Sequence, residues 1–268
     1  MSATETRDHT VLAHGFARTA REGFVASAAY FRSLPEDAWH GPTGCTKWDM
    51  RHLAEHITGE AVWFPNLVRG ATRGEAPLPA ETYEEHKRFS SAQLADATEQ
   101  AAAHVQAAIE EATPEQLEQE VDMGFAKLPI WTASYISLFE GVYHNWDTRA
   151  GREADVTIPT PWALQLATLM AQFGPMIAHQ KEAATAAGTY LLRVGDGVGP
   201  VTVDIRDGAI ALRHASEGTP DITVDLTADQ YVRLIAGRFK LEGSNVPIEG
   251  DRGRAAALNR VFGGVANE

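Results

Sequence analysis

The chain has 268 residues, of which 44% are hydrophobic and 22% charged, a composition typical of a folded globular protein of one or two domains. Its formal net charge of -13, without any run of Lys or Arg, disfavours binding to nucleic acid or to anionic membranes. The beginning of the sequence lacks a signal-peptide pattern and no long apolar stretch occurs, so we expect a cytoplasmic protein. A single cysteine, Cys45, excludes an internal disulfide, so any metal must be held mainly by nitrogen and oxygen.

Helical periodicity dominates the first part of the chain. Apolar residues recur at helical spacing over roughly 11–34, 47–70, 82–112 and 130–151. Four amphipathic helices of this length predict a four-helix bundle. The Gly- and Pro-containing segment that follows, "GREADVTIPTP", indicates an interdomain connection, so we predict domains at 1–154 and 155–268.

The second part changes from helical to alternating periodicity. A helix is predicted at about 161–187, and its assignment to either domain is left open. From residue 189 onward, four segments alternate apolar and polar residues, with Asp207-Gly208 as a hairpin turn. Two further helical segments, "TADQYVRLIAGRFK" and "RGRAAALNRVF", follow the strands. The predicted fold class is therefore α+β in two domains: a four-helix bundle, then a small antiparallel sheet with helices.

One histidine of the second helix is predicted to point into the bundle. On a helical wheel centred on Leu53, His56 falls on the apolar face, whereas His52 lies at its margin. Glu60 follows His56 one turn later, on the same side of the helix. His56 is therefore the inward-facing histidine of the pair.

The fourth helix is apolar around most of its circumference and is interrupted by Glu140 and His144. These residues are four apart and project from one face, where the preceding positions Ser137 and Ala133 are small. At about 1.5 Å rise per residue, His56 and Glu140 both lie near the middle of their helices. Two imidazoles and one carboxylate can hold a divalent metal while leaving coordination positions open, which predicts a metal site at His56, Glu140 and His144.

Two alternatives compete with this hypothesis. In the first alternative there is no metal: His56 is a core histidine bonded to a backbone carbonyl, and Glu140 forms an ion pair with His144 within one helix. A second ligand set, His52 with His56, also has the required spacing, although His52 faces outward. The order of residues does not match the H-E-x-x-H motif of zinc proteases. Cys45 precedes the second helix, where it is either structural or close to the site.

The segments "TGCTKWDMRHLAEHITGE" and "FEGVYHNWDTRAG" resemble the mycothiol-dependent maleylpyruvate isomerase family of the DinB-like metalloproteins. "LTADQYVRLIAGRFKLEG" is similar to the sterol-carrier-protein-like domain that follows the bundle in that family. The resemblance covers nearly the whole chain. It implies a DinB-like bundle at 1–154 and a sterol-carrier-protein-like domain at 155–268.

The resemblance also implies a site. Zinc, or another divalent metal, would be held by His56, Glu140 and His144, facing a cleft between the domains. Mycothiol would bind the metal through its sulfur, since a cation lowers the pKa of a thiol. Arg238 matches a family arginine directed at the cleft and would bind a substrate carboxylate; alternatively it is a solvated residue near a helix end. Asp147 is either an orienting partner of His144 or a surface charge.

The implied function is an enzyme that acts on small molecules. A thiolate would add to an activated cis double bond, allow rotation and leave, as in an isomerase, or would remain attached, as in an S-transferase. Two other functions stay open: a thiol-independent metal-dependent hydrolase or lyase, and a non-enzymatic carrier of an apolar ligand.

Overall fold

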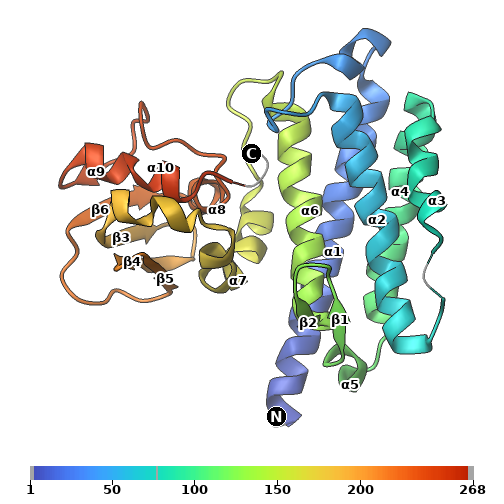
Figure 1. Cartoon of the computed structure of the whole chain (residues 1–268), viewed down its shortest axis with the longest axis horizontal. Helices are drawn as coiled ribbons and strands as arrows, with labels where there is room; N and C mark the ends of the chain where they lie inside the picture. Colours follow the sequence, from blue (N-terminus) through green and yellow to red (C-terminus); the bar gives the residue numbers. More distant parts are fainter. Residues whose placement is uncertain (1–2, 77, 265–268) are drawn as a thin grey trace. The chain divides into compact units, whose positions relative to one another are not determined.

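The computed structural model describes residues 3–76 and 78–264 and divides into two compact units, Met1–Val156 and Thr157–Glu268 (Figure 1). The first unit contains α1 (Ala3–Ser33), η1 (Glu36–His40), α2 (Met50–Arg73), α3 (Ala80–Glu85), η2 (His86–Arg88), α4 (Ser91–Glu110), α5 (Pro114–Leu117), β1 (Glu120–Asp122), β2 (Lys127–Pro129) and α6 (Ile130–Ala150). The second contains α7 (Thr160–Ile177), η3 (Gln180–Ala186), β3 (Gly188–Val194), β4 (Gly199–Arg206), β5 (Ala209–Arg213), β6 (Ile222–Leu226), α8 (Ala228–Ile235), β7 (Ile248–Glu249), α9 (Arg252–Ala256) and α10 (Leu258–Val261).

The predicted four-helix bundle is confirmed. The four long helices α1, α2, α4 and α6 lie side by side (Figure 1), and α1 and α2 each pack against both α4 and α6. Their facing surfaces bury large apolar side chains, among them Phe16, Phe24, Met50, Leu53 and Tyr143. Burial of such side chains, each stabilising by about 1.5–3 kcal/mol, is what holds the helices together.

The predicted helix over 82–112 is interrupted rather than continuous. The chain leaves helical geometry after His86–Arg88 and starts again at α4. Ser90 is the cause: its side chain accepts the N–H of Gln93, while the Gln93 side chain accepts the N–H of Ser90. This capping box satisfies donors that a new helix leaves open, so the local sequence favours a start at Ser91.

A short hairpin, β1–β2, was not predicted from the sequence. Its strands have three residues each, too few for alternation to be recognised, and pair antiparallel. The turn depends on Gly124, which has a positive φ of 83° and donates its N–H to the Asp122 carboxylate. The hairpin matters for function because Met123 and Phe125 lie at its turn.

Close helix packing fixes the position of α6. A Cβ atom on Gly141 would lie 2.6 Å from the carbonyl oxygen of Ala20 on α1, so only glycine allows this approach. Gly23 on α1 meets the Gly141 backbone in the same way. Since Gly141 follows Glu140 directly, the contact that holds α1 against α6 also fixes the backbone of a candidate ligand.

The sheet of the second unit has the order β5-β4-β3-β6-β7. The alternating segments predicted from the sequence form β3 to β6, and Asp207 and Gly208, both with positive φ, make the tight turn between β4 and β5. The predicted antiparallel pairing holds for three of the four strand pairs, whereas β6 pairs parallel to β3. After β5 the chain crosses to the free edge of β3 instead of turning back, so β6 enters in the same direction as β3.

Helices border this sheet, with α7 contacting β5 and α8. The helix predicted at about 161–187 ends earlier, at Ile177, because Ala178 adopts an extended conformation and 3₁₀ turns follow. The predicted closing helix likewise splits into α9 and α10.

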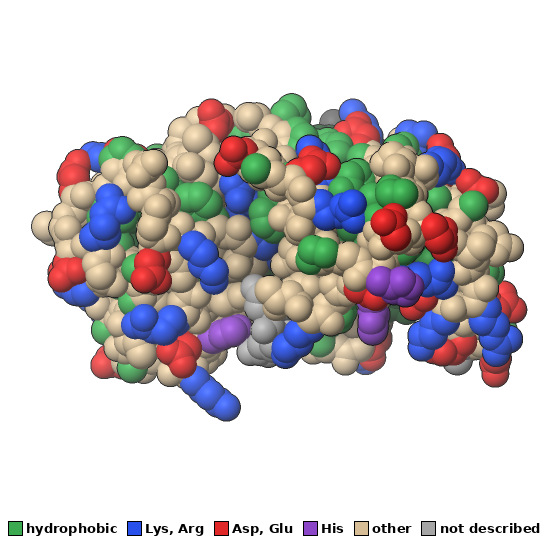
Figure 2. Space-filling view, turned by 90° about the horizontal axis from the view of Figure 1, so that it is seen from above, with side chains coloured by type: hydrophobic (Ala, Val, Ile, Leu, Met, Phe, Trp, Pro, Cys, Tyr) green, Lys and Arg blue, Asp and Glu red, His purple; other side chains and the backbone are tan. Residues whose placement is uncertain are grey.

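No helix among the described residues is long and apolar enough to cross a membrane. Acidic and basic side chains are interspersed over the face shown in Figure 2.

Candidate metal centre and its pocket

The three residues predicted as metal ligands meet between α2 and α6. Oε2 of Glu140 lies 3.0 Å from Nε2 of His56 and 3.0 Å from Nε2 of His144. One ligand atom from each residue can be chosen so that all lie within 4.8 Å of one another. The structure thus brings together side chains that are 84 residues apart in the sequence.

The cluster is open on one side and closed on the other. The side chains of His56 and Glu140 are 28% and 20% exposed, whereas that of His144 is 9% exposed. A small molecule could therefore reach the site from the side of His56 and Glu140, while His144 forms its inner wall.

Two buried polar side chains, Asp147 and Cys45, lie beside Nδ1 of His144. Its Nδ1 lies 2.9 Å from Oδ2 of Asp147, a fully buried carboxylate one turn further along α6. The thiol of Cys45, which is also buried, donates to the same oxygen at 3.3 Å. Gly44 allows this approach, since a Cβ there would lie 2.6 Å from Oδ1 of Asp147. Asp147 is therefore not a surface charge, and Cys45 lies beside the site.

The described residues contain a second group of potential ligand atoms, made of Cys45, His144 and Asp147. These atoms already satisfy one another through hydrogen bonds and are all buried. A metal there would have no open position. The group is better explained as a support that holds the Nδ1 proton of His144 toward Asp147 and leaves Nε2 facing Glu140.

Electrostatics of the cluster are strongly perturbed. Burial alone would raise the pKa of Glu140, but the charge and hydrogen bonds of His144, together with His56, lower it below its ordinary range. Burial alone would lower the pKa of His144, but Glu140 and the hydrogen bond to Asp147 raise it well above its ordinary value. In the protein without metal, the cluster thus needs a positive charge, which a protonated His144 supplies.

A divalent cation would supply the same charge. Nε2 of both histidines and Oε2 of Glu140 converge, and the Nδ1–H of His144 has its own acceptor in Asp147. A neutral imidazole in this tautomer presents a lone pair at Nε2, which is the form that coordinates a metal. The donor set, with one side open, fits a zinc-type site that keeps a position for water or substrate.

A pocket of about 570 Å³ opens onto His56 and Glu140. One part of its wall is aromatic or apolar and the other part is charged or polar. The apolar part consists of Trp48, Trp63, Met123, Phe125 and Ile136, and the polar part of His52, Glu55, Glu60, Glu84 and Lys87. The contribution of Met123 and Phe125 was not predicted from the sequence, because no element was predicted between the helices at 82–112 and 130–151.

Glu60 also lies in this pocket, one helical turn beyond His56. Burial, and secondarily the nearby charge of Glu140, raise its pKa to about 8. Its spacing of four residues from His56 was the sequence signal for this placement.

The other sequence candidates, His52 and Arg238, are not members of the cluster. His52 is exposed and stacks on Trp48, with ring centroids 5.6 Å apart. Arg238 follows α8 in the second unit, after the tight turn at Gly237, and its guanidinium donates to the carbonyl of Ala236. The side chain of Arg238 is half-buried.

Fold and site together define a DinB-like helical bundle with a His₂Glu cluster, joined to an α+β domain. Residues 20–149 match the family model "Mycothiol maleylpyruvate isomerase N-terminal domain", and residues 166–263 match the "SCP-2 sterol transfer family". The chain therefore belongs to the family defined by the mycothiol maleylpyruvate isomerase N-terminal domain, here followed by an SCP-2 domain.

Solved structures agree with this assignment. A crystal structure of the mycothiol-dependent maleylpyruvate isomerase is similar to this chain with a TM-score of 0.58 and 19% identity, covering 93% of this chain and 96% of the other. A histidine-to-alanine mutant of that isomerase matches with a TM-score of 0.57 and the same identity and coverage. These likenesses establish a shared fold. A search of curated proteins finds no match.

Proposed function

We propose that this chain is a metal-dependent enzyme that uses a low-molecular-weight, mycothiol-like thiol to isomerise a small electrophile or to transfer sulfur to it. The metal, zinc or another divalent ion, would be held by His56, Glu140 and His144. The observation that carries the proposal is the convergence of these three donors beside an open pocket. Family membership and the activity named for the similar isomerase structures support the thiol.

When bound, such a metal lowers the pKa of a thiol at its open position, so that the nucleophilic thiolate exists at neutral pH. The residues of the chain prepare for this. Asp147 accepts the Nδ1 proton of His144 and so fixes the tautomer whose Nε2 faces the site. The Trp48 ring packs beside both histidines, with its centroid 4.8 Å from that of His56 and 6.0 Å from that of His144, and so helps to hold the two imidazoles in place.

Arg238 is the residue that we propose to bind a carboxylate of the electrophile. A guanidinium can form two parallel hydrogen bonds with a carboxylate, which orients the substrate as well as holding it. The tight turn at Gly237 and the bond to the Ala236 carbonyl restrict where this side chain can point. The proposed role follows from the match of its sequence segment to the family.

Elemental analysis of purified protein, followed by an activity screen on small cis-unsaturated ketoacids with and without mycothiol, tests the proposal. We expect about one divalent metal per chain and turnover only when both metal and thiol are present. His52→Ala is the matched control for His56→Ala, because both histidines line one pocket and only His56 belongs to the cluster. Metal-dependent turnover without any thiol would instead indicate a hydrolase or lyase, and absence of metal after metal-replete purification would contradict the proposal.

A further inference from the structure

Glu60 differs from the other glutamates of the pocket. Glu55 is paired with Arg51 on its own helix, and Glu84 is paired with Lys87. Glu60 forms no hydrogen bond or ion pair with any residue that the structure describes. Burial without a partner favours the protonated form of Glu60, and a divalent cation at the neighbouring cluster would favour its ionised form, which then needs a partner from a ligand.

The charge around Glu60 shows what kind of ligand group fits. Among the described residues that line the pocket there is no arginine, and the one lysine, Lys87, is paired with Glu84. A divalent cation on the three ligands would be balanced by Glu140 and Glu60 together, so a bound thiolate would make the site negative. A further carboxylate would then be repelled, whereas an ammonium group or hydroxyl donors would be attracted.

The apolar wall of the pocket favours the same groups. Trp48 and Trp63 face the cavity together with Glu60. Aromatic faces attract cations, and they do so more strongly where water is excluded. Tryptophan walls with an unpaired carboxylate therefore form a site for a positively charged or hydroxyl-rich group.

We propose that Glu60 is a specificity-determining residue of this pocket. Through Glu60 the pocket selects thiols that carry hydrogen-bond donors without negative charge, above all an ammonium group. It rejects thiols that carry a carboxylate. The inference rests on the proposed function, since it assumes that the thiol sulfur binds at the cluster. On this inference the pocket binds the body of the thiol cosubstrate. A carboxylate of the electrophile would be bound by groups outside this pocket, in keeping with the role proposed for Arg238.

Cobalt-loaded protein provides a direct test, because coordination of sulfur to Co²⁺ produces a charge-transfer absorption that reports binding without turnover. The probes are three thiols of equal chain length: 4-aminobutanethiol, 4-mercaptobutanol and 4-mercaptobutanoate. We expect the amine to bind about tenfold or more tightly than the carboxylate, with the alcohol between them. Metal analysis after desalting confirms that no thiol removes the cobalt.

Two variants then show which residue causes this order of thiol affinities. Glu60→Gln keeps the size of the side chain and removes its charge, and we expect the ratio between amine and carboxylate to fall to about threefold or less. Glu84→Gln is the matched control, since it removes an exposed, paired glutamate from the same pocket and should change the ratio less than twofold or so.

The outcomes separate this inference from the proposed function. If all three thiols produce the absorption with equal affinity, or if Glu60→Gln keeps the wild-type order, the inference is wrong and the thiol-using enzyme stands. If no thiol perturbs the cobalt spectrum, thiol binding at the cluster fails, and the inference fails with it.

Discussion

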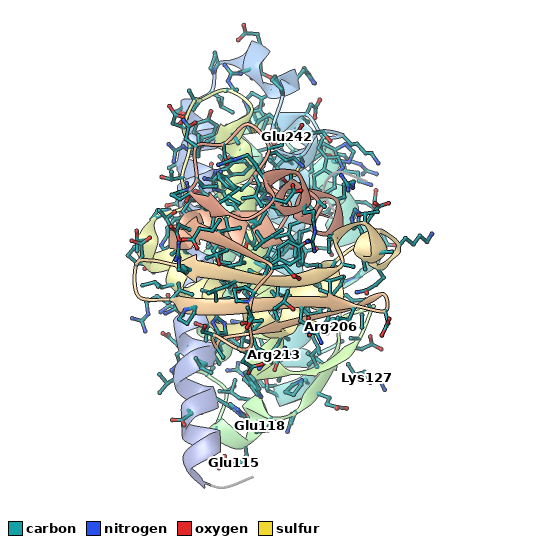
Figure 3. The ribbon with its side chains drawn as sticks, turned by 90° about the vertical axis from the view of Figure 1, so that its left-hand side faces the viewer. Glu115, Glu118, Lys127, Arg206, Arg213 and Glu242 are labelled. Carbon is teal, nitrogen blue, oxygen red and sulfur yellow. The ribbon has the colours of Figure 1, made fainter. Side chains whose placement is uncertain are left out.

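The two units of the chain differ in the buried ionisable side chains that they hold. In the first unit Glu140 and Asp147 each lie within hydrogen-bonding distance of His144, one at each ring nitrogen. In the second unit several ion pairs involve exposed arginines: Arg206 and Arg213, labelled in Figure 3, both pair with Asp204. Exposed pairs of this kind contribute little to stability, whereas a buried cluster is costly unless its charges are balanced.

The best shielded ion pair of the second unit has a structural explanation. Arg233 and Asp229 are one turn apart on α8, and Asp229 also accepts the N–H of Ile158 at 2.7 Å. This pair ties α8 to the segment that enters the domain. Among the described residues, groups of potential metal ligands occur only in the first unit. We therefore expect the first unit to carry the chemistry of the proposed function, and the predictions below test this division.

The largest expected effect is the loss of metal on substitution of a ligand. His56→Ala, Glu140→Ala and His144→Ala should each reduce the bound metal from about one per chain to nearly none, because two remaining donors do not hold a divalent ion against dilution. His52→Ala should keep it. Elemental analysis after desalting makes the measurement, and retention of metal by Glu140→Ala combined with its loss in His52→Ala would show that the ligand assignment is wrong.

Convergence of the ligands could be predicted from the sequence because it depends on helix geometry alone. His56 lies on the apolar face of α2, and Glu140 and His144 share a face of a nearly all-apolar helix. When two such helices pack in one bundle, their apolar faces must meet, and this brings the candidate ligands together. The pairing of β6 with β3 depends instead on a crossover between strands, and alternation within a strand does not encode which neighbour it chooses.

The support around the ligands was only partly predictable. Asp147 lies three residues after His144, so a contact was one of two open interpretations. The contact between Cys45 and Asp147 joins residues 102 apart and depends on the close approach allowed at Gly44. The contribution of Phe125 to the pocket depends on a hairpin whose two strands have three residues each, too few to show a recognisable period. Long-range contacts and very short elements are the parts that a single sequence does not encode locally.

Substitution of Arg238 tests whether the second unit takes part in the reaction. Arg238→Ala should leave the metal content unchanged and weaken turnover of an anionic substrate by roughly 2–5 kcal/mol if the guanidinium binds a buried carboxylate. Arg238→Lys should rescue poorly, since lysine lacks the planar fork. Steady-state kinetics with matched metal analysis measure both. Wild-type kinetics for Arg238→Ala would confine the chemistry to the first unit.

A smaller effect is expected for the residues that support His144. Asp147→Asn should weaken metal binding by about 10–100-fold, because the amide no longer favours the tautomer with its proton on Nδ1. Cys45→Ala removes one donor to Asp147 and should have a weaker effect, which Cys45→Ser should largely rescue through its hydroxyl. Competition with a chelator measures these affinities. Equal affinity in wild type and Asp147→Asn would show that Asp147 serves only the packing of α6.

The smallest effect is a change in the pH dependence of stability. In the metal-free protein the pKa values of His144 and Glu60 lie above their ordinary values of 6.5 and 4.5, that of Glu60 at about 8. Between pH of about 5.5 and 7.5 the folded state then binds more protons than the unfolded state, so stability falls as pH rises. The lowered pKa of Glu140 adds nothing in this window, since its contribution is lost only at lower pH.

The metal-loaded protein should behave oppositely. Both histidines must be neutral to coordinate, so metal affinity, and with it stability, rises with pH across the same window. We expect the difference in Tm between the two forms to widen by about 2–4 °C or more from the lower to the higher pH. Thermal unfolding of metal-free and metal-replete protein measures it, with Glu60→Gln reducing the slope of the metal-free form. Parallel slopes for both forms would mean that the buried charges of the first unit are balanced without a cation, as an ion pair within the bundle.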